Sequence, residues 1–300
     1  MNHTTSYDRL KPERLVASLF VASQYLLPHH LLSSLMYRLT RIESPAFKNT
    51  LIRKFIGLYG VEMAEAMEPD PSRYRSFNDF FTRALQPDAR PVSQDEHNIV
   101  CPADGVLSQA GDIEDGYLFQ AKGHDYALLD LLGGDMPWSR RFEEGSFATI
   151  YLSPKDYHRV HMPYSGTLKK MIHVPGRLFS VNDTTTRRVP GLFARNERVI
   201  CLFETDLGPM AVILVGAIFV ASIETLWAGV ITPVSRQVHH WDYPPTQPEE
   251  PIRLDKGEEM GRFNMGSTVI LLFGKDRIEW LEEIEPGQSV KMGRILGNRT

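Results

Sequence analysis

Short runs of β-branched and aromatic residues, separated by Gly, Pro, Asn and Asp, dominate the chain from Ile99 to Phe273. Typical runs are residues 147–152, 199–203 and 210–215. Runs of this length bounded by turn residues are typical of strands, and their close spacing favours antiparallel pairing. This part of the chain is therefore predicted to be β-rich and largely antiparallel.

The N-terminal part has apolar residues at helical spacing instead. Between Arg14 and Arg38 the chain has no Asp, Glu, Lys or Arg, but Pro28 divides this stretch in two. Each half is shorter than the roughly 20 apolar residues that a transmembrane helix requires. Residues 15–21 also resemble the core of a signal peptide, although no small-residue cleavage site follows and two acidic residues weaken the basic flank.

Two further segments each have one apolar helical face. Residues 31–39 align four leucines and a methionine, and residues 47–59 align Phe, Leu, Ile and Tyr beside three basic residues. Such faces suit the surface of an anionic membrane, or they pack against the rest of the protein, and both alternatives need the same periodicity. Ser76 has the spacing of a helix cap and predicts one more short helix.

Helices followed by strands predict an α+β protein. We expect a helical, membrane-associating region at residues 1–90 and a β-rich catalytic domain at residues 91–300. A chain of 300 residues with 42% hydrophobic content can bury a core of that size. The net charge of −4 argues against a nucleic-acid binder. Cys101 and Cys201 lack CxxC spacing, which excludes a cysteine-type zinc site and predicts a reduced, cytoplasmic-side protein.

A Gly-Ser pair, Gly266-Ser267, lies directly before the apolar run 268–273. Gly266 has no side chain to shield its carbonyl carbon, and the Ser267 hydroxyl is placed to attack that carbon if a base removes its proton. The alternative is a tight turn before a strand. Residues elsewhere in the chain favour the reactive interpretation.

Three other residues carry the required chemistry. Asp104 stands in a Pro-Ala-Asp-Gly turn, and His158 and His161 are three residues apart. This pair lacks a third ligand at metal-site spacing, so no metal is expected. In an extended segment the two rings point to opposite faces, so we expect two separate tasks, with His158 facing a space away from the Gly266-Ser267 bond.

The chain contains the three residue types of an Asp-His-Ser triad, namely Asp104, His161 and Ser267. Such a triad is defined by geometry and not by order in the sequence. The GxSxG motif of many serine hydrolases is absent. A serine followed at once by a predicted strand fits attack on its own preceding peptide bond better than attack on a foreign substrate.

The chain resembles the bacterial, membrane-associated phosphatidylserine decarboxylases from about residue 15 to about residue 290. The matching segments are residues 102–105, 120–124, 151–163, 174–182, 192–198 and 257–263. The family's processing motif usually reads Leu-Gly-Ser-Thr, and here it reads Met265-Gly266-Ser267-Thr268. A Leu-to-Met difference leaves the reacting atoms unchanged.

The resemblance implies self-cleavage between Gly266 and Ser267, driven by Asp104, His161 and Ser267. Ser267 forms an ester, undergoes β-elimination and ends as a covalent pyruvoyl group on the small C-terminal chain. This group condenses with the serine amine of the lipid and accepts the electrons released with CO2, so no added cofactor or metal is needed. His158 is implied as the acid that protonates the substrate carbon.

The implied product is phosphatidylethanolamine, made from phosphatidylserine by a zymogen that cleaves itself. The large and small chains stay together as a non-covalent heterodimer, with a homodimer of such pairs expected. The implied location is peripheral, on the cytoplasmic face of the inner membrane. Two alternatives remain: a membrane-docked binding module, which would run as one band on a denaturing gel, and a self-processing hydrolase that keeps Ser267 as a free nucleophile.

Overall fold

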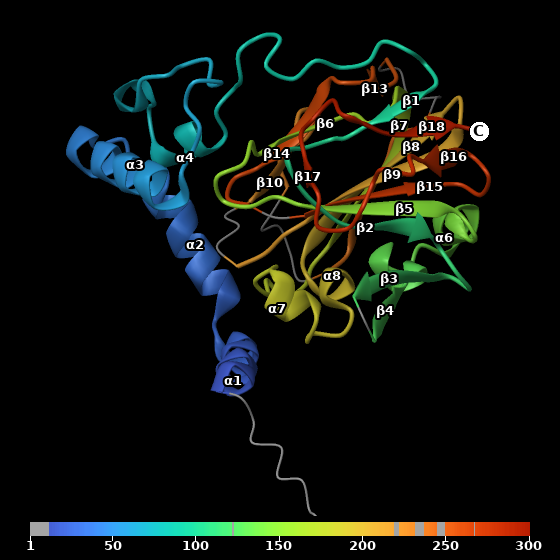
Figure 1. Ribbon diagram of the computed structural model, residues 1–300, viewed down its shortest axis with the longest axis horizontal. Helices are drawn as coiled ribbons and strands as arrows, with labels where there is room; N and C mark the ends of the chain where they lie inside the picture. Colours follow the sequence, from blue (N-terminus) through green and yellow to red (C-terminus); the bar gives the residue numbers. More distant parts are fainter. Residues whose placement is uncertain (1–11, 122, 219–221, 232–236, 245–249, 267) are drawn as a thin grey trace, which may run out of the picture.

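The computed structural model describes residues 12–121, 123–218, 222–231, 237–244, 250–266 and 268–300. The first helices form an arm beside a sheet-rich body (Figure 1). The helical elements are α1 (Pro12–Leu26), α2 (His29–Leu39), α3 (Pro45–Tyr59), the 3₁₀ turn η1 (Pro71–Arg73), α4 (Phe77–Phe81), α5 (Leu128–Leu131), α6 (Met136–Phe142), α7 (Asp183–Thr186) and α8 (Leu192–Arg195).

Local sequence explains where these helices begin and end. Pro28 separates α1 from α2, since proline has no N–H to continue the helical hydrogen bonds. Gly60 ends α3 in the left-handed conformation, with a φ of 66°. The Oγ of Ser76 accepts a hydrogen bond from the Asp79 N–H at 3.1 Å and caps α4, which confirms the short helix predicted there.

The apolar faces of the helices are used in two ways. Ile52 of α3 is fully buried in a small cluster with aromatic residues of α4 such as Phe80. Leu26, Leu31 and Leu58 are instead 87%, 69% and 77% exposed. Packing therefore accounts for part of the pattern, and an apolar surface remains. No helix in the described part of the chain combines the length and apolarity needed to cross a bilayer.

The rest of the chain is mainly antiparallel strands. They are β1 (Asn98–Val100), β2 (Gly105–Asp112), β3 (Tyr117–Ala121), β4 (His124–Ala127), β5 (Ser146–Tyr151), β6 (Arg159–His161), β7 (Gly166–Val174), β8 (Arg198–Thr205), β9 (Gly208–Val215), β10 (Ile223–Thr225), β11 (Gly229–Val230), β12 (His239–Asp242), β13 (Arg253–Leu254), β14 (Glu259–Phe263), β15 (Thr268–Phe273), β16 (Ile278–Trp280), β17 (Ser289–Val290) and β18 (Ile295–Arg299).

The strand that follows the Gly-Ser pair lies inside the largest sheet. That sheet has nine strands, and β15 pairs with β9 on one side and β5 on the other. All six residues of β15 are buried. The continuous apolar run predicted a buried strand. The position of β15 between β9 and β5 confirms this prediction.

Helices followed by a largely antiparallel, sheet-rich body confirm the predicted α+β class. The boundary near residue 90 stays a prediction. A four-stranded sheet with the order β11-β10-β14-β6 is a second platform. Its strands β14 and β6 carry the segments that lead to Gly266 and to the two histidines of the sequence analysis.

Candidate active site

The Gly266-Ser267 bond lies between two firmly held segments, although Ser267 itself lies outside the described residues. On the N-terminal side, the Phe263 N–H donates to the His158 carbonyl at 3.0 Å, and the Asn264 N–H donates to the Ser222 carbonyl at 2.9 Å. On the C-terminal side, Thr268 is fully buried and pairs with strands on both sides. The bond is therefore located where the chain passes from one sheet into the other.

The residue just before Gly266 has an unfavourable backbone conformation. Met265 has a φ of 100°, a region that residues with a side chain rarely adopt. The residue before it is held by its side chain: Asn264 donates to the Ser222 Oγ at 2.8 Å and accepts from the Asn78 amide at 2.9 Å. Backbone strain of this kind costs on the order of 1–3 kcal/mol and is concentrated at functional sites.

His158 is the histidine that borders the Gly266-Ser267 bond. A Cβ built on Gly266 would lie 3.0 Å from the His158 Nε2. The imidazole is fully buried, with its ring centroid 4.0 Å from that of Phe81. The expectation that His158 faces a space away from the scissile bond is therefore wrong. The rings of the pair do have separate surroundings, but the nearer one to Gly266 is His158.

The hydrogen bonds of His158 define its protonation state. Its Nδ1 lies 2.8 Å from the Asp156 carbonyl, which can only accept, so Nδ1 carries the proton. Its Nε2 is buried without a hydrogen-bond partner. Burial, with the charge of Arg83 as the next contribution, lowers the pKa of His158 to about 3. The ring is thus neutral near pH 7 and presents a free lone pair next to Gly266.

His161 is neutral as well, but both of its ring nitrogens are occupied. Its Nδ1 donates to the Gly257 carbonyl at 2.8 Å, and its Nε2 accepts from the Tyr157 hydroxyl at 2.9 Å. Burial lowers its pKa below the usual value. The His161 N–H also donates to the Pro102 carbonyl at 2.8 Å, which places β6 beside the turn that contains Asp104.

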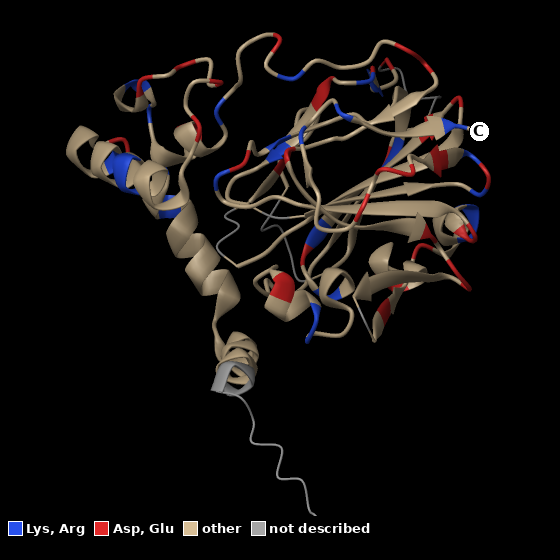
Figure 2. Cartoon of the chain, viewed as in Figure 1, with Lys and Arg blue, Asp and Glu red and all other residues tan. Residues whose placement is uncertain are grey.

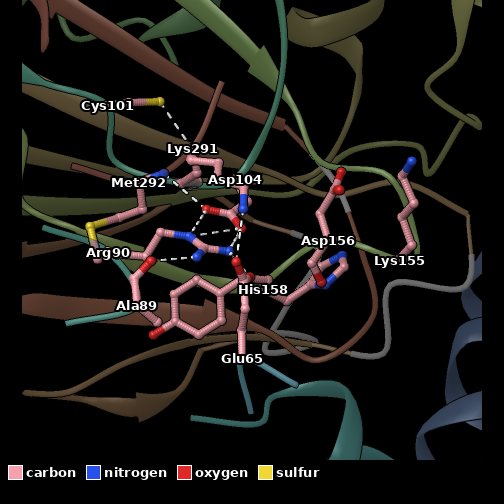
Figure 3. A network of polar contacts seen from close by, with 12 residues as sticks. Glu65, Ala89, Arg90, Cys101, Asp104, Lys155, Asp156, His158, Lys291 and Met292 are labelled. Atoms are coloured by element: carbon pink, nitrogen blue, oxygen red, sulfur yellow. Dashed lines mark hydrogen bonds and ion pairs between the residues drawn. The ribbon is translucent and has the colours of Figure 1, made fainter. Parts of the chain in front are cut away.

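Asp104 is engaged by an arginine and a backbone amide (Figure 3). Arg90 donates to its Oδ1 through Nε at 2.9 Å and to its Oδ2 through Nη2 at 2.5 Å. The Met292 N–H donates to Oδ1 at 2.9 Å. Both residues are described, and no hydrogen bond joins Asp104 to His161. The proposed roles of Asp104, His161 and Ser267 stay predictions.

Comparison with known proteins identifies the family to which the chain is similar. Residues 77–298 match the family model described as phosphatidylserine decarboxylase, and residues 19–60 match a second model described as PSD. The phosphatidylserine decarboxylase proenzyme of Bordetella pertussis is 59% identical over 278 residues, covering 93% of each chain. The proenzyme of Azotobacter vinelandii is 55% identical over 280 residues, covering 93% of this chain and 97% of its own.

The chain belongs to the phosphatidylserine decarboxylase family. This confirms the family resemblance drawn from the sequence and the prediction that the chain is an enzyme of the decarboxylase class. The relatives' names also describe them as proenzymes. In the part of this decarboxylase that the structure describes, no group of three or more His, Cys, Asp or Glu side chains could hold a metal ion.

Sequence reasoning missed the partners that decide how the decarboxylase site is arranged. Arg90, which holds Asp104, lies in a Pro-Asp-Ala-Arg-Pro stretch that has the composition of a linker. The backbone carbonyl of Asp156 fixes the proton position of His158, and the charge of Arg83 adds to burial in lowering its pKa; neither contact is marked by a sequence motif. The only sequence signal for these three partners was that they lie in, or near, segments that resemble the family.

A cavity of about 840 Å³ lies close to the start of β15 in this decarboxylase. Its lining includes Tyr151, the cross-strand partner of Thr268, together with Val181 and Asn182. The segment that leads into this wall contacts the helical arm: the Ser180 N–H donates to Gln24 of α1 at 3.0 Å. The chain segment that lines part of the cavity is therefore adjacent to a residue that contacts the arm.

Proposed function

We propose that the protein is a pyruvoyl-dependent phosphatidylserine decarboxylase, which cleaves itself between Gly266 and Ser267 and then converts phosphatidylserine to phosphatidylethanolamine and CO2. Family membership supports the reaction class, and the relatives' name of proenzyme supports processing. The single observation that carries the proposal is the unpartnered Nε2 of a neutral His158 beside Gly266, at a bond held on both sides.

Self-cleavage is a step that the chain's own residues supply. The Ser267 Oγ forms a bond to the Gly266 carbonyl carbon while the peptide C–N bond breaks and the proton of Oγ passes through a base to the leaving amine. We propose Asp104, His161 and Ser267 as the residues of this step. The free lone pair of His158 at Gly266 favours a second candidate for the base, and variants of the two histidines distinguish them.

Variants of Asp104 and His161 test the first assignment. Asp104→Ala and His161→Ala are expected to accumulate uncleaved precursor, because loss of a triad member typically lowers the rate by about 10³-fold or more. A time course on a denaturing gel measures the fraction cleaved. Normal two-chain protein from both variants would remove the triad assignment.

The unpartnered Nε2 of His158 beside Gly266 supports a pyruvoyl group derived from Ser267, because a polar group formed there would give this buried nitrogen a partner. The pyruvoyl group supplies an electron sink for the electrons released with CO2. His158 handles the proton: as a neutral imidazole it takes one from the substrate ammonium and returns it to the substrate α-carbon after CO2 has left. No added cofactor or metal is part of the proposal.

The two chains stay associated because the cleavage site precedes a central strand. The small chain would begin at Ser267, so β15 enters it complete, with both neighbouring strands remaining in the large chain. Burial of six apolar or β-branched residues on both faces holds the pair without a covalent link. A homodimer of these pairs remains part of the proposal and rests on the family resemblance.

We place the protein at the cytoplasmic face of the inner membrane, held peripherally by its helical arm. In Figure 2 the part of the arm drawn in tan, from the later turns of α1 through most of α2, is almost free of charge, whereas basic residues appear on α3. Exposed leucines and the exposed Arg53 and Lys54 give the combination that binds anionic bilayers. The contact between Gln24 and Ser180 brings this arm to the wall of the 840 Å³ cavity, which suits a lipid substrate.

Point variants test the arm better than a truncation does, since deleting residues 1–60 would also remove Ile52 from its buried cluster. Leu26→Glu with Leu31→Glu is expected to lower binding to anionic vesicles at least 10-fold, because each buried leucine contributes about 1.5–3 kcal/mol. Leu226→Glu, a 52% exposed leucine of the sheet-rich body, is the matched control. Undiminished co-sedimentation of the double variant would show that another surface docks.

Intact mass of the purified protein, combined with an assay for phosphatidylethanolamine, tests the whole proposal. Two chains that meet at residues 266 and 267, with a pyruvoyl end on the smaller one, are expected. A serine at that end would favour the self-processing hydrolase, and a single uncut chain would favour the binding module.

A further inference from the structure

Asp104 has a buried carboxylate that needs a countercharge. Its side chain is 9% exposed, and that of Arg90 is 6% exposed. Removing a carboxylate from water is costly unless it is paired and hydrogen-bonded. Arg90 supplies both the charge and a planar, two-point hydrogen bond, while the Met292 N–H supplies a third donor. A carboxylate held by donors in this way has little freedom to rotate.

Arg90 is itself fixed by contacts on its other sides. Its Nη1 donates to the Ala89 carbonyl at 2.6 Å, and its Nη2 donates to Glu65 at 2.6 Å. Glu65 also accepts from Lys291 at 2.9 Å. The hydrogen bond from Arg90, followed by that from Lys291, lowers the pKa of Glu65 to about 2, so the Glu65 carboxylate is ionised near pH 7.

These contacts join three parts of the chain that are far apart in the sequence. Glu65 precedes α4, Arg90 and Asp104 precede β2, and Lys291 and Met292 follow β17 (Figure 3). Residues 291–292 would belong to the small chain after cleavage. The orientation of Asp104 is thus complete only when the C-terminal segment is already in place.

We propose that Arg90 is a positioning residue for self-cleavage, which holds the Asp104 carboxylate in one orientation beside the strand of His161. The inference rests on the proposed function, in which Asp104 serves the cleavage of the Gly266-Ser267 bond. Arg90 touches none of the reacting atoms and acts through Asp104. A displacement of about 1 Å at such a group lowers a rate by about 10²-fold.

Chemical rescue separates this role from simple structural support. The full chain carrying Arg90→Ala is synthesised in a cell-free system, and cleavage is followed on a denaturing gel. We expect cleavage about 100-fold slower than in the wild type. Added guanidinium ion restores a large part of the rate by occupying the space of the missing side chain, whereas urea, which is planar, of similar size and uncharged, does not. The inference would be overturned if Arg90→Ala is cleaved at the wild-type rate, or if guanidinium and urea change the cleavage rate equally.

Arg141→Ala is the matched control, because Arg141 also forms a two-point ion pair, with Glu204 on the surface. It is expected to cleave at the wild-type rate and to ignore guanidinium. If Arg90→Ala does not fold, Arg90→Lys keeps the charge but not the two-point geometry, and we expect it to fold and to cleave about 10-fold more slowly. A wild-type rate for Arg90→Lys would then overturn the inference.

The same assay keeps this inference apart from the proposed function. If the wild-type chain is not cleaved, or if Ser267→Ala is cleaved at the same bond, the proposed function fails. If the wild type is cleaved, Ser267→Ala is not, and Arg90→Ala matches the wild type, only the positioning role of Arg90 fails.

Discussion

Ser267→Ala is expected to leave the chain in one piece and to abolish phosphatidylethanolamine formation. The substitution removes the only atom that forms the ester with Gly266, and the same atom must leave before a pyruvoyl group can arise. The methyl side chain of alanine can supply neither step. A denaturing gel, intact mass and a lipid product assay on one preparation measure the loss.

Ser267→Cys is the matched variant, because it keeps a nucleophile on the same carbon. We expect it to be cleaved, at a rate different from that of the wild type, and to yield the same small chain by loss of the sulfur. Cleavage of Ser267→Ala at the 266–267 bond would end the internal-ester mechanism. A processed wild-type chain that retains serine at its new end would assign the protein to the self-processing hydrolases instead.

His158→Gln is expected to be cleaved and to acquire its pyruvoyl group, but to turn over at least 100-fold more slowly than the wild type. Loss of a positioned acid or base typically lowers a rate by about 10²–10⁴-fold. Glutamine keeps much of the size of the buried ring next to Phe81, yet it cannot take up and return a proton. Gel or mass analysis reports processing, and released CO2 reports turnover.

The position of His158 beside Gly266 gives this experiment a second informative outcome. Because its Nε2 has no partner and lies beside Gly266, His158 is also suited to act as the base of self-cleavage. An uncleaved His158→Gln, paired with a normally cleaved His161→Gln, would move the base from His161 to His158. Full turnover by a cleaved His158→Gln would contradict the proton-transfer role.

Local sequence alone was enough to predict the elements and to propose the reactive bond. The β-branched run after Ser267 required a buried strand, and Pro28 required a break between two helices, because both effects act within a few residues. The Gly-Ser pair and the candidate Asp and His residues were identified from the chemistry of their side chains. The segments that resemble the family supplied the reaction, and the match over residues 77–298 agrees with them.

Only the tertiary structure decided which groups meet. Alternation along an extended segment correctly separated the surroundings of His158 and His161, but it carries no information about which of the two borders Gly266, more than 100 residues away. Nor does the sequence indicate that Arg90, in a linker-like stretch, holds Asp104 together with an amide 188 residues further along. Such contacts follow from how whole sheets pack, because buried charges must find partners wherever the fold brings donors, and local periodicity does not encode that position.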